Sequence, residues 1–378
     1  QMHNADRVTL AFLLSATDAG AVAANYVSAD RFLVQGRQVT GVAGTDRLSG
    51  ETFDVRARVV VNAAGPWAGG LLATLPSGAP KAAPPRLSRA MNLVVRRVTR
   101  THACGGLADG RFLFLVPWRD VSILGTSHDA HDGGPEALSV TRWDLEAFLA
   151  DSRKAFPHAN LTSGDVRLVH RGLLPMRRGE GMNVALLKES VVLDHRRHGL
   201  DGLVTLFGVR YTTARRTAAD AVDAVFDQLQ QGGTPACRTG EHPLAGGAIG
   251  NIASFERAVL LRDVPGLGKD ALERLASTYG TQYDAVLQVV RDHPEMAAPL
   301  GKHCAVTGAE ILHAVRAEMA VKLGDAFLRR TEAGSAGHPG SDAIEAAAAV
   351  MAWELGWDTW RTSEEIAALE GFYRRQVS

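Results

Sequence analysis

The stretch VVVNAAGPWAGG, residues 59–70, is the most informative part of the sequence. Three β-branched residues run directly into Asn62, and only small residues and a proline follow before the bulky Trp67. An apolar run of this kind is typical of a strand covered on both faces in a parallel sheet. Pro66 suits the first turn of a short helix. A surface turn tolerates larger residues, so we expect a ligand to approach the backbone closely here.

Length and composition restrict the function. The 378 residues predict two or three domains. Lys and Arg together number 41, as do Asp and Glu, so no overall charge favours nucleic acid. Three cysteines lie far apart without a C-x-x-C pair, which argues against disulfides and structural zinc and favours a reducing compartment. No apolar stretch approaches the ~20 residues that span a bilayer.

The order of the predicted elements indicates three parts. A first helix capped by Asn4 or Asp6 precedes several strands between residues 23 and 64. Residues 87–193 are rich in strands, which one helix over about 141–156 interrupts. A strand, a glycine turn and a helix follow in residues 201–230, and the chain from about 255 to 373 is predicted to be helical.

The strand-turn-helix unit around Gly208 is a candidate anion site. A helix that begins near Thr212 or Thr213 leaves its first backbone N–H groups unpaired. Together with the helix dipole, these groups favour negative charge at that point. The other interpretation is an ordinary helix start without a ligand. The residues of this segment alone leave both open.

Five blocks of sequence carry a family resemblance. In chain order they are VVVNAAGPWA, GRFLFLVPWRDVSILGTS, GLLPM, FGVRYTTAR and EMAVKLGDAFLRRT. Together they resemble the FAD-dependent glycerol-3-phosphate dehydrogenase family over almost the whole chain. The fold implied is α/β plus α+β. It has a partial FAD-binding domain of the glutathione-reductase type (1–80 and 200–235), a β-rich substrate domain (81–199) and an all-helical C-terminal domain (240–378).

The resemblance implies FAD as the cofactor and indicates where its ring lies. The first block contributes a turn of small residues that lets the backbone approach the ring, and the fourth contributes a helix start that suits the negative charge of a reduced flavin. No metal is implied. The implied cofactor-binding residues are Ala63, Ala64, Gly65, Pro66, Trp67, Gly208, Val209, Tyr211 and Thr212.

The chain departs from the family pattern at several positions. The phosphate-binding G-x-G-x-x-G is missing, since GGAIG at 246–250 has the wrong spacing. We therefore expect the sequence to begin inside a longer polypeptide and to hold FAD weakly by itself. Leu174 replaces the family's substrate-site arginine, Asn92 stands where histidine is frequent, and Arg210 replaces a lysine.

The candidate catalytic residues follow from these departures. Arg210 keeps a positive charge and suits a phosphate or carboxylate, so with Thr213 it is expected to clamp an anion rather than act as a base. Arg171 is a second candidate cation. His170, which follows an alternating strand, is a candidate base.

The implied reaction is the flavin-dependent oxidation of glycerol 3-phosphate, a small anionic polyol, to dihydroxyacetone phosphate, with electrons passed to quinone or oxygen. One alternative is an FAD-dependent oxidase of another small hydroxy or amino acid. Another is a non-catalytic fragment or partner subunit without bound flavin. The resemblance implies a cytoplasmic protein and leaves open contact with the inner face of the membrane and a homodimer.

Other polar and aromatic groups are expected to be structural. The segment from His128 to Asp132 is predicted to be a polar turn rather than a metal site. Asp325 and Arg329 are predicted to form a surface pair. Three tryptophans at 353, 357 and 360 are predicted to pack in a helical core.

Overall fold

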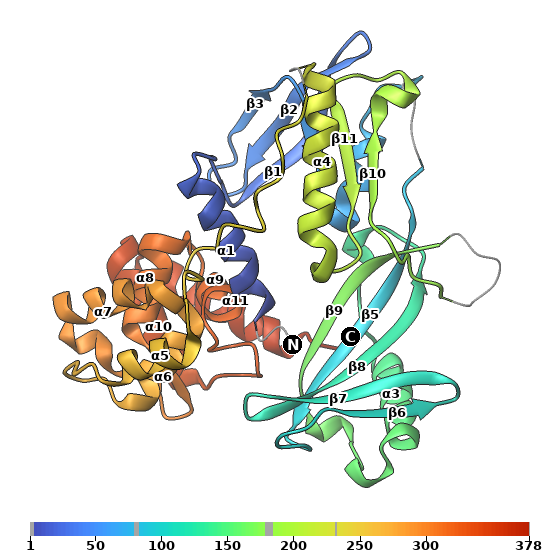
Figure 1. The fold of residues 1–378 in the computed structure, drawn as a ribbon. Coiled ribbons are helices and arrows are strands. Elements are labelled where there is room, and N and C mark those ends of the chain that lie inside the picture. The colour runs from blue at the N-terminus through green and yellow to red at the C-terminus, as the bar shows by residue number, and fades with distance from the viewer. Residues whose placement is uncertain (1–3, 79–82, 178–183, 231–232, 378) are drawn as a thin grey trace.

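The computed structural model describes residues 4–78, 83–177, 184–230 and 233–377, and its described residues form three parts (Figure 1). Two of them contain β-sheets, and the third, in the C-terminal region, consists almost entirely of helices. This mixed α/β architecture with a helical C-terminal part agrees with the predicted fold class.

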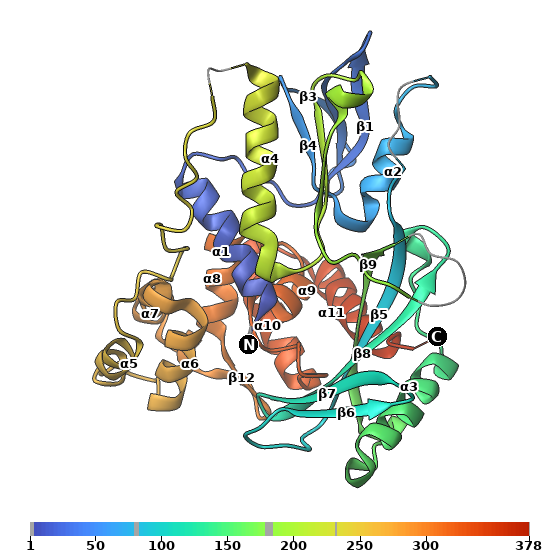
Figure 2. The same ribbon diagram turned by 45° about the vertical axis from the view of Figure 1, so that its right-hand side comes forward.

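A small sheet forms the centre of the first part. Strand β4 (Val60–Asn62) pairs in parallel with β11 (Leu203–Phe207), and β10 (Val191–Asp194) pairs antiparallel on the other side of β11. Helix α4 (Ala214–Leu229) lies alongside this sheet, and the short α2 (Ala68–Ala73) follows β4 (Figure 2). The parallel pairing confirms the interpretation of the apolar run.

A three-stranded antiparallel sheet completes the first part. It consists of β1 (Val27–Gln35), β2 (Gln38–Asp46) and β3 (Thr52–Arg56), in that order. Buried side chains from this sheet, α2 and β11 form one core. These residues are Phe32, Val39, Ala68, Leu72, Leu203 and Phe207.

The second part is a five-stranded antiparallel sheet in the order β6, β7, β8, β5, β9. The strands are β6 (Cys104–Ala108), β7 (Arg111–Trp118), β8 (Val121–His131), β5 (Arg86–Arg96) and β9 (Val166–Met176). Arg119 and Asp120 join β7 and β8 in a hairpin. Strand β8 continues to His131, so the polar turn predicted from His128 is wrong; Asp129 instead pairs with Arg89.

The two faces of this sheet have different partners. Helix α3 (Arg142–Ala155) begins with a capping box between Thr141 and Asp144 and packs its apolar side against one face. The opposite face packs Trp118 and Leu168 against the C-terminal part. The sheet is therefore fixed between one of its own helices and the helical part.

The C-terminal part contains a series of helices. They are α5 (Ile252–Leu260), α6 (Lys269–Tyr279), α7 (Tyr283–Asp292), α8 (Gly308–Glu318), α9 (Leu323–Asp325), α10 (Ser341–Leu355) and α11 (Thr359–Arg374). The short hairpin of β12 (Pro299–Gly301) and β13 (Cys304–Thr307) departs from the expectation of helices alone.

Two expectations for this part are wrong. Trp353 and Trp360 are exposed by 55% and 68%, so they do not belong to a helical core, whereas Trp357 packs against one as predicted. Asp325 does pair with Arg329 at 3.2 Å, but the Asp325 side chain is only 5% exposed. It also accepts a hydrogen bond from the Tyr26 hydroxyl at 2.8 Å. Spacing along a helix predicts pairing, but it does not predict which elements will cover the pair.

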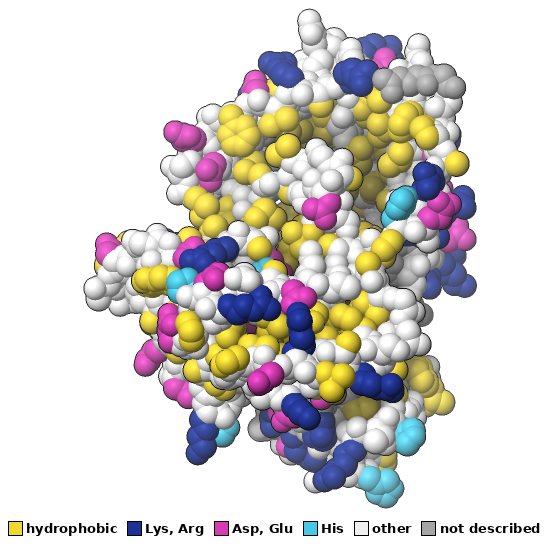
Figure 3. Space-filling model, turned by 60° about the vertical axis from the view of Figure 1, so that its left-hand side comes forward, with side chains coloured by type: hydrophobic (Ala, Val, Ile, Leu, Met, Phe, Trp, Pro, Cys, Tyr) yellow, Lys and Arg dark blue, Asp and Glu magenta, His cyan; other side chains and the backbone are white. Residues whose placement is uncertain are grey.

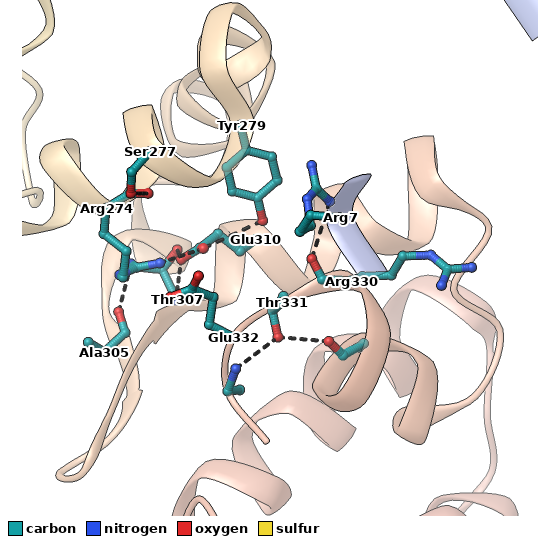
Figure 4. A network of polar contacts seen from close by, with 12 residues as sticks. Arg7, Arg274, Ser277, Tyr279, Ala305, Thr307, Glu310, Arg330, Thr331 and Glu332 are labelled. Carbon is teal, nitrogen blue, oxygen red and sulfur yellow. Dashed lines mark hydrogen bonds and ion pairs between the residues drawn. The ribbon is translucent and has the colours of Figure 1, made fainter. Parts of the chain in front are cut away.

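Helix α1 (Ala5–Asp18), with Asn4 as its N-cap, lies between α4 and the C-terminal helices (Figures 1 and 2). Arg7 Nη1 donates to both Glu318 carboxylate oxygens at 2.6 and 2.7 Å. It also donates to the Arg330 carbonyl at 3.2 Å, as Figure 4 shows. The side chains of Arg7 and Glu318 are 10% and 1% exposed. This buried ion pair anchors α1 to the C-terminal part.

The ion pair adjoins a wider buried network (Figure 4). The Arg7 guanidinium lies 4.5 Å from the centre of the Tyr279 ring, and the Tyr279 hydroxyl donates to Glu310 at 3.5 Å. Arg274 donates to the same carboxylate at 2.5 Å. Helices α1, α6 and α8 are thus held together by largely buried charges.

We predict that Arg7→Ala lowers the free energy of unfolding by about 3 kcal/mol, because it leaves the Glu318 carboxylate buried without its main partner. Urea denaturation at pH 7 measures this change. Arg216→Ala, which removes an exposed pair with Asp220 on α4, is the control and should leave the free energy unchanged. An equal effect of both variants would contradict the role given to Arg7.

The same pair predicts a pH dependence. Burial raises the pKa of Glu318, but the hydrogen bond from His313 and the charge of Arg7 outweigh it, so the pKa lies below its ordinary value. A carboxyl with a lowered folded-state pKa stabilises the fold above its unfolded pKa, and this stabilisation is lost as pH falls through the folded value. The difference between wild type and Arg7→Ala should therefore shrink in acid.

Candidate flavin site

Hydrogen bonds from one buried side chain stabilise the turn after β4. Asn62 is 3% exposed; its Nδ2 donates to the Ala68 carbonyl at 3.1 Å, and its Oδ1 accepts from the Ala64 amide at 3.3 Å. Gly65 has φ of 56°, a left-handed conformation that suits glycine. Since Asn62 satisfies the turn from inside, the backbone of Ala63 to Gly65 is left exposed.

The turn after β11 leads into a helix start. Gly208 is followed by a 3₁₀ turn, Tyr211–Thr213, and then by α4. Neither helical segment has a side-chain cap at its N-terminus, and Thr213 Oγ1 instead donates to the Arg210 carbonyl at 3.2 Å. The Thr213 amide donates to the Arg210 carbonyl at 3.3 Å, so the N–H groups of Tyr211 and Thr212 are the ones placed to favour an anionic group.

The parallel pairing brings these two turns together. Asn62 lies opposite Thr205, so β4 and β11 end at the same edge of the sheet. Both turns then border one cavity of about 40 Å³. Its lining residues are Gly65, Pro66, Phe207 and Gly208 from the turns, with Leu87, Leu173 and Pro175 from β5 and β9.

Each of the two turns places one glycine at this cavity, and both glycines leave space there. A Cβ atom added at Gly65 or Gly208 would meet no other atom within 4 Å. Neither glycine is therefore required by close protein packing in the described structure, although φ favours glycine at position 65. The arrangement accommodates the edge of a flat ring against backbone and apolar side chains.

Charged groups lie near one side of these turns. Arg210 is exposed, and its Nη2 donates to the Lys188 carbonyl at 2.6 Å. Lys188 is exposed as well, so the backbone of a second basic residue from a separate segment lies beside the Arg210 guanidinium. Trp67 is 51% exposed and donates from Nε1 to Glu136 at 2.7 Å. Sequence reasoning missed Lys188, because it follows no strand or motif that marks it.

The structure leaves some of the other predicted site residues in the turn and directs the side chains of others elsewhere. The Tyr211 hydroxyl points to α1, where it contacts the Thr9 hydroxyl and reaches the Ala5 carbonyl at 3.5 Å. Val209 and Thr212 follow Gly208 in the turn itself. Arg171 is exposed and donates to the Gln376 carbonyl at 3.0 Å.

His170 borders a second cavity of about 540 Å³, between β9, α1 and the C-terminal part. Burial lowers the pKa of His170 more than the Asp6 carboxylate raises it, so the ring tends to be neutral. His170 and Leu173 are three residues apart on β9, which corresponds to roughly 10 Å along a strand. His170 and Arg171 are therefore not brought to the cavity between the two turns.

Behind the turns, a further polar pair supports the sheet. His195 is fully buried, and its Nε2 lies 2.9 Å from the Thr205 hydroxyl. Burial lowers the pKa of His195. Because Thr205 lies opposite Asn62, buried polar side chains occupy both strands just before the turns. Sequence reasoning missed this support, because His195 and Thr205 are distant along the chain from the turn at Asn62.

Family models match almost the entire chain. Residues 1–225 match the model described as FAD dependent oxidoreductase. The chain belongs to this FAD-dependent oxidoreductase family. Residues 237–362 match the C-terminal domain of alpha-glycerophosphate oxidase. The family is FAD-dependent, in agreement with the predicted cofactor, and the resemblance to glycerol-3-phosphate dehydrogenases is confirmed.

Similar proteins share this resemblance. The glycerol-3-phosphate dehydrogenase of Synechocystis is 28% identical over 88% of this chain and 62% of its own length. The aerobic glycerol-3-phosphate dehydrogenase of Staphylococcus aureus is 27% identical over 86% of this chain and 59% of its own length. This chain thus spans about three-fifths of the length of the curated relatives that it matches.

A solved structure is similar over nearly the whole chain. The crystal structure of the glycerol-3-phosphate dehydrogenase from Bacillus halodurans in complex with FAD matches with a TM-score of 0.79 and 28% identity. The match covers 99% of this chain and 73% of that protein. Within the residues that our structure describes, no helix of this family member is long and apolar enough to cross a membrane. The same residues contain no cluster of three or more metal-ligating side chains.

We predict that Asn62→Ala lowers the free energy of unfolding by about 2 kcal/mol, since it leaves the Ala68 carbonyl and the Ala64 amide without their partner. Limited proteolysis should also show faster cleavage after this turn opens. Asn251→Ala removes the exposed N-cap of α5 and is the control, with normal proteolysis near residue 65. Unchanged cleavage in Asn62→Ala would show that the turn holds without this side chain.

Proposed function

We propose that this chain provides the ring-side and substrate-side parts of a flavoenzyme that oxidises glycerol 3-phosphate to dihydroxyacetone phosphate. The observation that carries the proposal is the single cavity shared by the turns after β4 and β11. The names of the matching relatives support the substrate.

The two turns suit one edge of the FAD ring, and the cavity of about 40 Å³ between them would take that edge alone. When bound, FAD supplies an acceptor for the hydride of a secondary alcohol carbon. The exposed backbone of Ala63, Ala64 and Gly65, followed by Pro66 and Trp67, provides one wall with room for close approach. The backbone from Gly208 to Thr212 provides a second wall with free N–H groups, which suit the most electron-rich edge of the ring.

Arg210 and Lys188 are our candidates for binding the substrate anion. Both are exposed and lie at the same edge, next to the turn that carries Gly208. Arginine offers a planar fork to phosphate or carboxylate, while lysine adds a point charge. Thr213 holds the carbonyl of Arg210 and therefore acts here as a positioning residue. The role of Arg210 and Lys188 is to hold and orient the substrate. Arg210 does not act as a base, since a guanidinium cannot take up a proton near neutral pH.

The proposal also covers the residues that bind the pyrophosphate of FAD and the electron acceptor. The sequence contains no G-x-G-x-x-G, so we propose that residues outside this chain bind the FAD pyrophosphate. A quinone is the proposed acceptor, at a peripheral contact with the membrane. By itself the chain should therefore bind FAD weakly, through the ring.

One observation favours a second candidate function. Leu174 stands on β9 where the family has a substrate-site arginine, so this position of the strand offers no positive charge to a phosphate. This suits a small hydroxy or amino acid better than a polyol phosphate. The purified chain, supplied with FAD and a dye as electron acceptor, should oxidise glycerol 3-phosphate in preference to glycine or 2-hydroxyglutarate. Turnover of either of the others alone would establish the second candidate instead.

We predict that Gly208→Val abolishes the binding of FAD without changing the melting temperature. The new side chain enters space that no protein atom occupies, so it blocks the ring and not the fold. Quenching of flavin fluorescence measures binding. Gly70→Val, at another glycine with open space on α2, is the matched control and should bind FAD normally. Normal binding to Gly208→Val would place the ring elsewhere.

We predict that Arg210→Ala weakens glycerol 3-phosphate binding by roughly ten- to hundredfold, because a hydrogen bond to a charged group contributes about 1.5–3 kcal/mol. Isothermal titration calorimetry measures the affinity. Arg216→Ala, at an exposed position in the first turn of α4, is the control and should leave affinity unchanged. Equal affinity of all three proteins would exclude Arg210 from the substrate site.

A further inference from the structure

Helix α4 determines where the turn after β11 ends, yet little of this helix is buried. Of its sixteen residues, all of which the structure describes, Thr217 and Ala221 alone are buried. A helix with so few buried side chains gains little free energy from apolar packing. Its position relative to the ring site therefore depends on other contacts.

The side of α4 that faces α1 leaves room for movement. The two helices border an apolar groove, which is lined by Phe12, Ala218, Val222 and Phe226, among others. Hydrophobic side chains gather over this upper part of the molecule (Figure 3). Because the groove is open, the contacts of α4 with the small sheet on its other side fix its position.

Polar contacts join the far end of α4 to the start of β11. Gln228 Nε2 donates to an Asp194 carboxylate oxygen at 2.8 Å and to the Leu203 carbonyl at 3.0 Å. Its Oε1 accepts from the Gly202 amide at 2.8 Å. The strand, the turn at Gly208 and the helix are thus closed into one unit. A shift of β11 therefore moves the helix and the turn with it.

One buried histidine holds β11 itself. His195 begins the 3₁₀ turn His195–His198 after β10 and is fully buried, and its Nε2 lies 2.9 Å from Thr205 Oγ1. Thr205 is also fully buried and lies opposite Asn62, the side chain that stabilises the other turn. His195 thus fixes β11 at the level from which both turns of the ring site are supported.

The surroundings of His195 suit a neutral imidazole. Among the described residues, its Nδ1 is buried and has no hydrogen-bond partner. A buried N–H without an acceptor is costlier than an unused lone pair, so the proton belongs on Nε2, which donates it to Thr205. A protonated ring would place a charge and a second N–H where no acceptor lies.

The charges around His195 act in the same direction as its burial or against it. Burial lowers the pKa of His195, His198 of the same turn lowers it further, and the Asp194 carboxylate at the end of β10 raises it. Strand β11 faces the imidazole with the uncharged Thr205. The net effect is a lowered pKa, so the bond to Thr205 is kept at neutral pH.

We propose that His195 is a positioning residue for the ring site, and that it holds the Gly208 turn in place only while its imidazole is neutral. The inference rests on the proposed function and goes beyond it by assigning a residue that controls the site without touching the ring. Without the bond to Thr205, β11 is free to shift against β4, and the start of α4 moves with it. The two walls of the cavity then no longer face one edge of the ring.

The test compares FAD affinity among variants that are folded in the assay, measured by quenching of flavin fluorescence at pH 8. We expect His195→Leu to weaken binding by roughly tenfold, which corresponds to the loss of one hydrogen bond. Thr205→Val, which nearly keeps the shape of its side chain, should do the same. His195→Gln should restore the affinity of wild type, because its amide can donate to Thr205.

The matched control is His313→Leu, in the helical part. His313 is also a buried histidine, and it lies 3.5 Å from the Glu318 carboxylate. This variant should lower the melting temperature and leave FAD affinity unchanged. Hydrogen–deuterium exchange of the chain without FAD is a second measurement. The amides of β11 and α4 should exchange faster in His195→Leu and Thr205→Val than in wild type and His195→Gln.

The same bond predicts a pH dependence of FAD affinity. Because the pKa of His195 is lowered, the imidazole stays neutral below its ordinary pKa, and the bond is lost as pH falls through the lowered value. The affinity of wild type should therefore be constant above the ordinary pKa and fall in acid by up to about tenfold per pH unit. The affinity of His195→Gln should not show this fall.

The inference is overturned if folded His195→Leu and Thr205→Val bind FAD as wild type does and exchange their amides at the same rates. It is also overturned if His313→Leu loses FAD equally, if His195→Gln does not restore binding, or if that variant shows the same fall in acid. Faster exchange in the first two variants without FAD binding by wild type would leave the positioning role standing and show that the proposed ring site is wrong.

Discussion

The parallel pairing of β4 with β11 is the constraint on which the rest of the structure depends. Only three residue pairs form this ladder, yet it joins segments about 140 residues apart and ends both at one edge. Parallel strands cannot be joined by a tight turn, so the chain between them is free to build the five-stranded sheet. Because both strands end together, a turn of small residues and a helix start face one cavity. A binding site at the carboxyl ends of parallel strands follows from this geometry.

The second constraint is the attachment of α1 to the C-terminal helices. Arg7 and Glu318 form a buried ion pair, and such a pair contributes mainly by making its own disruption costly. Asn25 strengthens the attachment through a hydrogen bond to the Met319 carbonyl at 2.6 Å. The first residues of the described chain thus connect the first part of the structure with the helical part. The cavity at His170 exists because this connection places Asp6 opposite β9.

Local sequence predicted most of the helices and strands. It failed where contacts between distant segments determine the position or the burial of a side chain. The apolar run before Asn62, the capped helix at 142–155 and the hairpin at Arg119 were predictable, because strand pattern, capping residues and turn residues act over a few positions. The small residues at 63–65 and Gly208 indicated a site, and the structure brings them together. The positions of His170 and Arg171 were harder to predict, because the surroundings of each side chain depend on the packing of the C-terminal part. Lys188 and the support of Asn62 by neighbouring buried polar groups depend on tertiary contacts that no local pattern records. The exposure of Trp353 and Trp360 has the same cause, since only packing decides which side of a helix is covered.

The account depends on one flavin ring between two turns of the same chain. Crystallography of this chain soaked with FAD tests this most directly. The account predicts electron density for the isoalloxazine ring against the backbone of Ala64–Gly65 on one side and of Gly208–Thr212 on the other. Density for the ring in the groove between α1 and α4, or in contact with only one of the two turns, would contradict it.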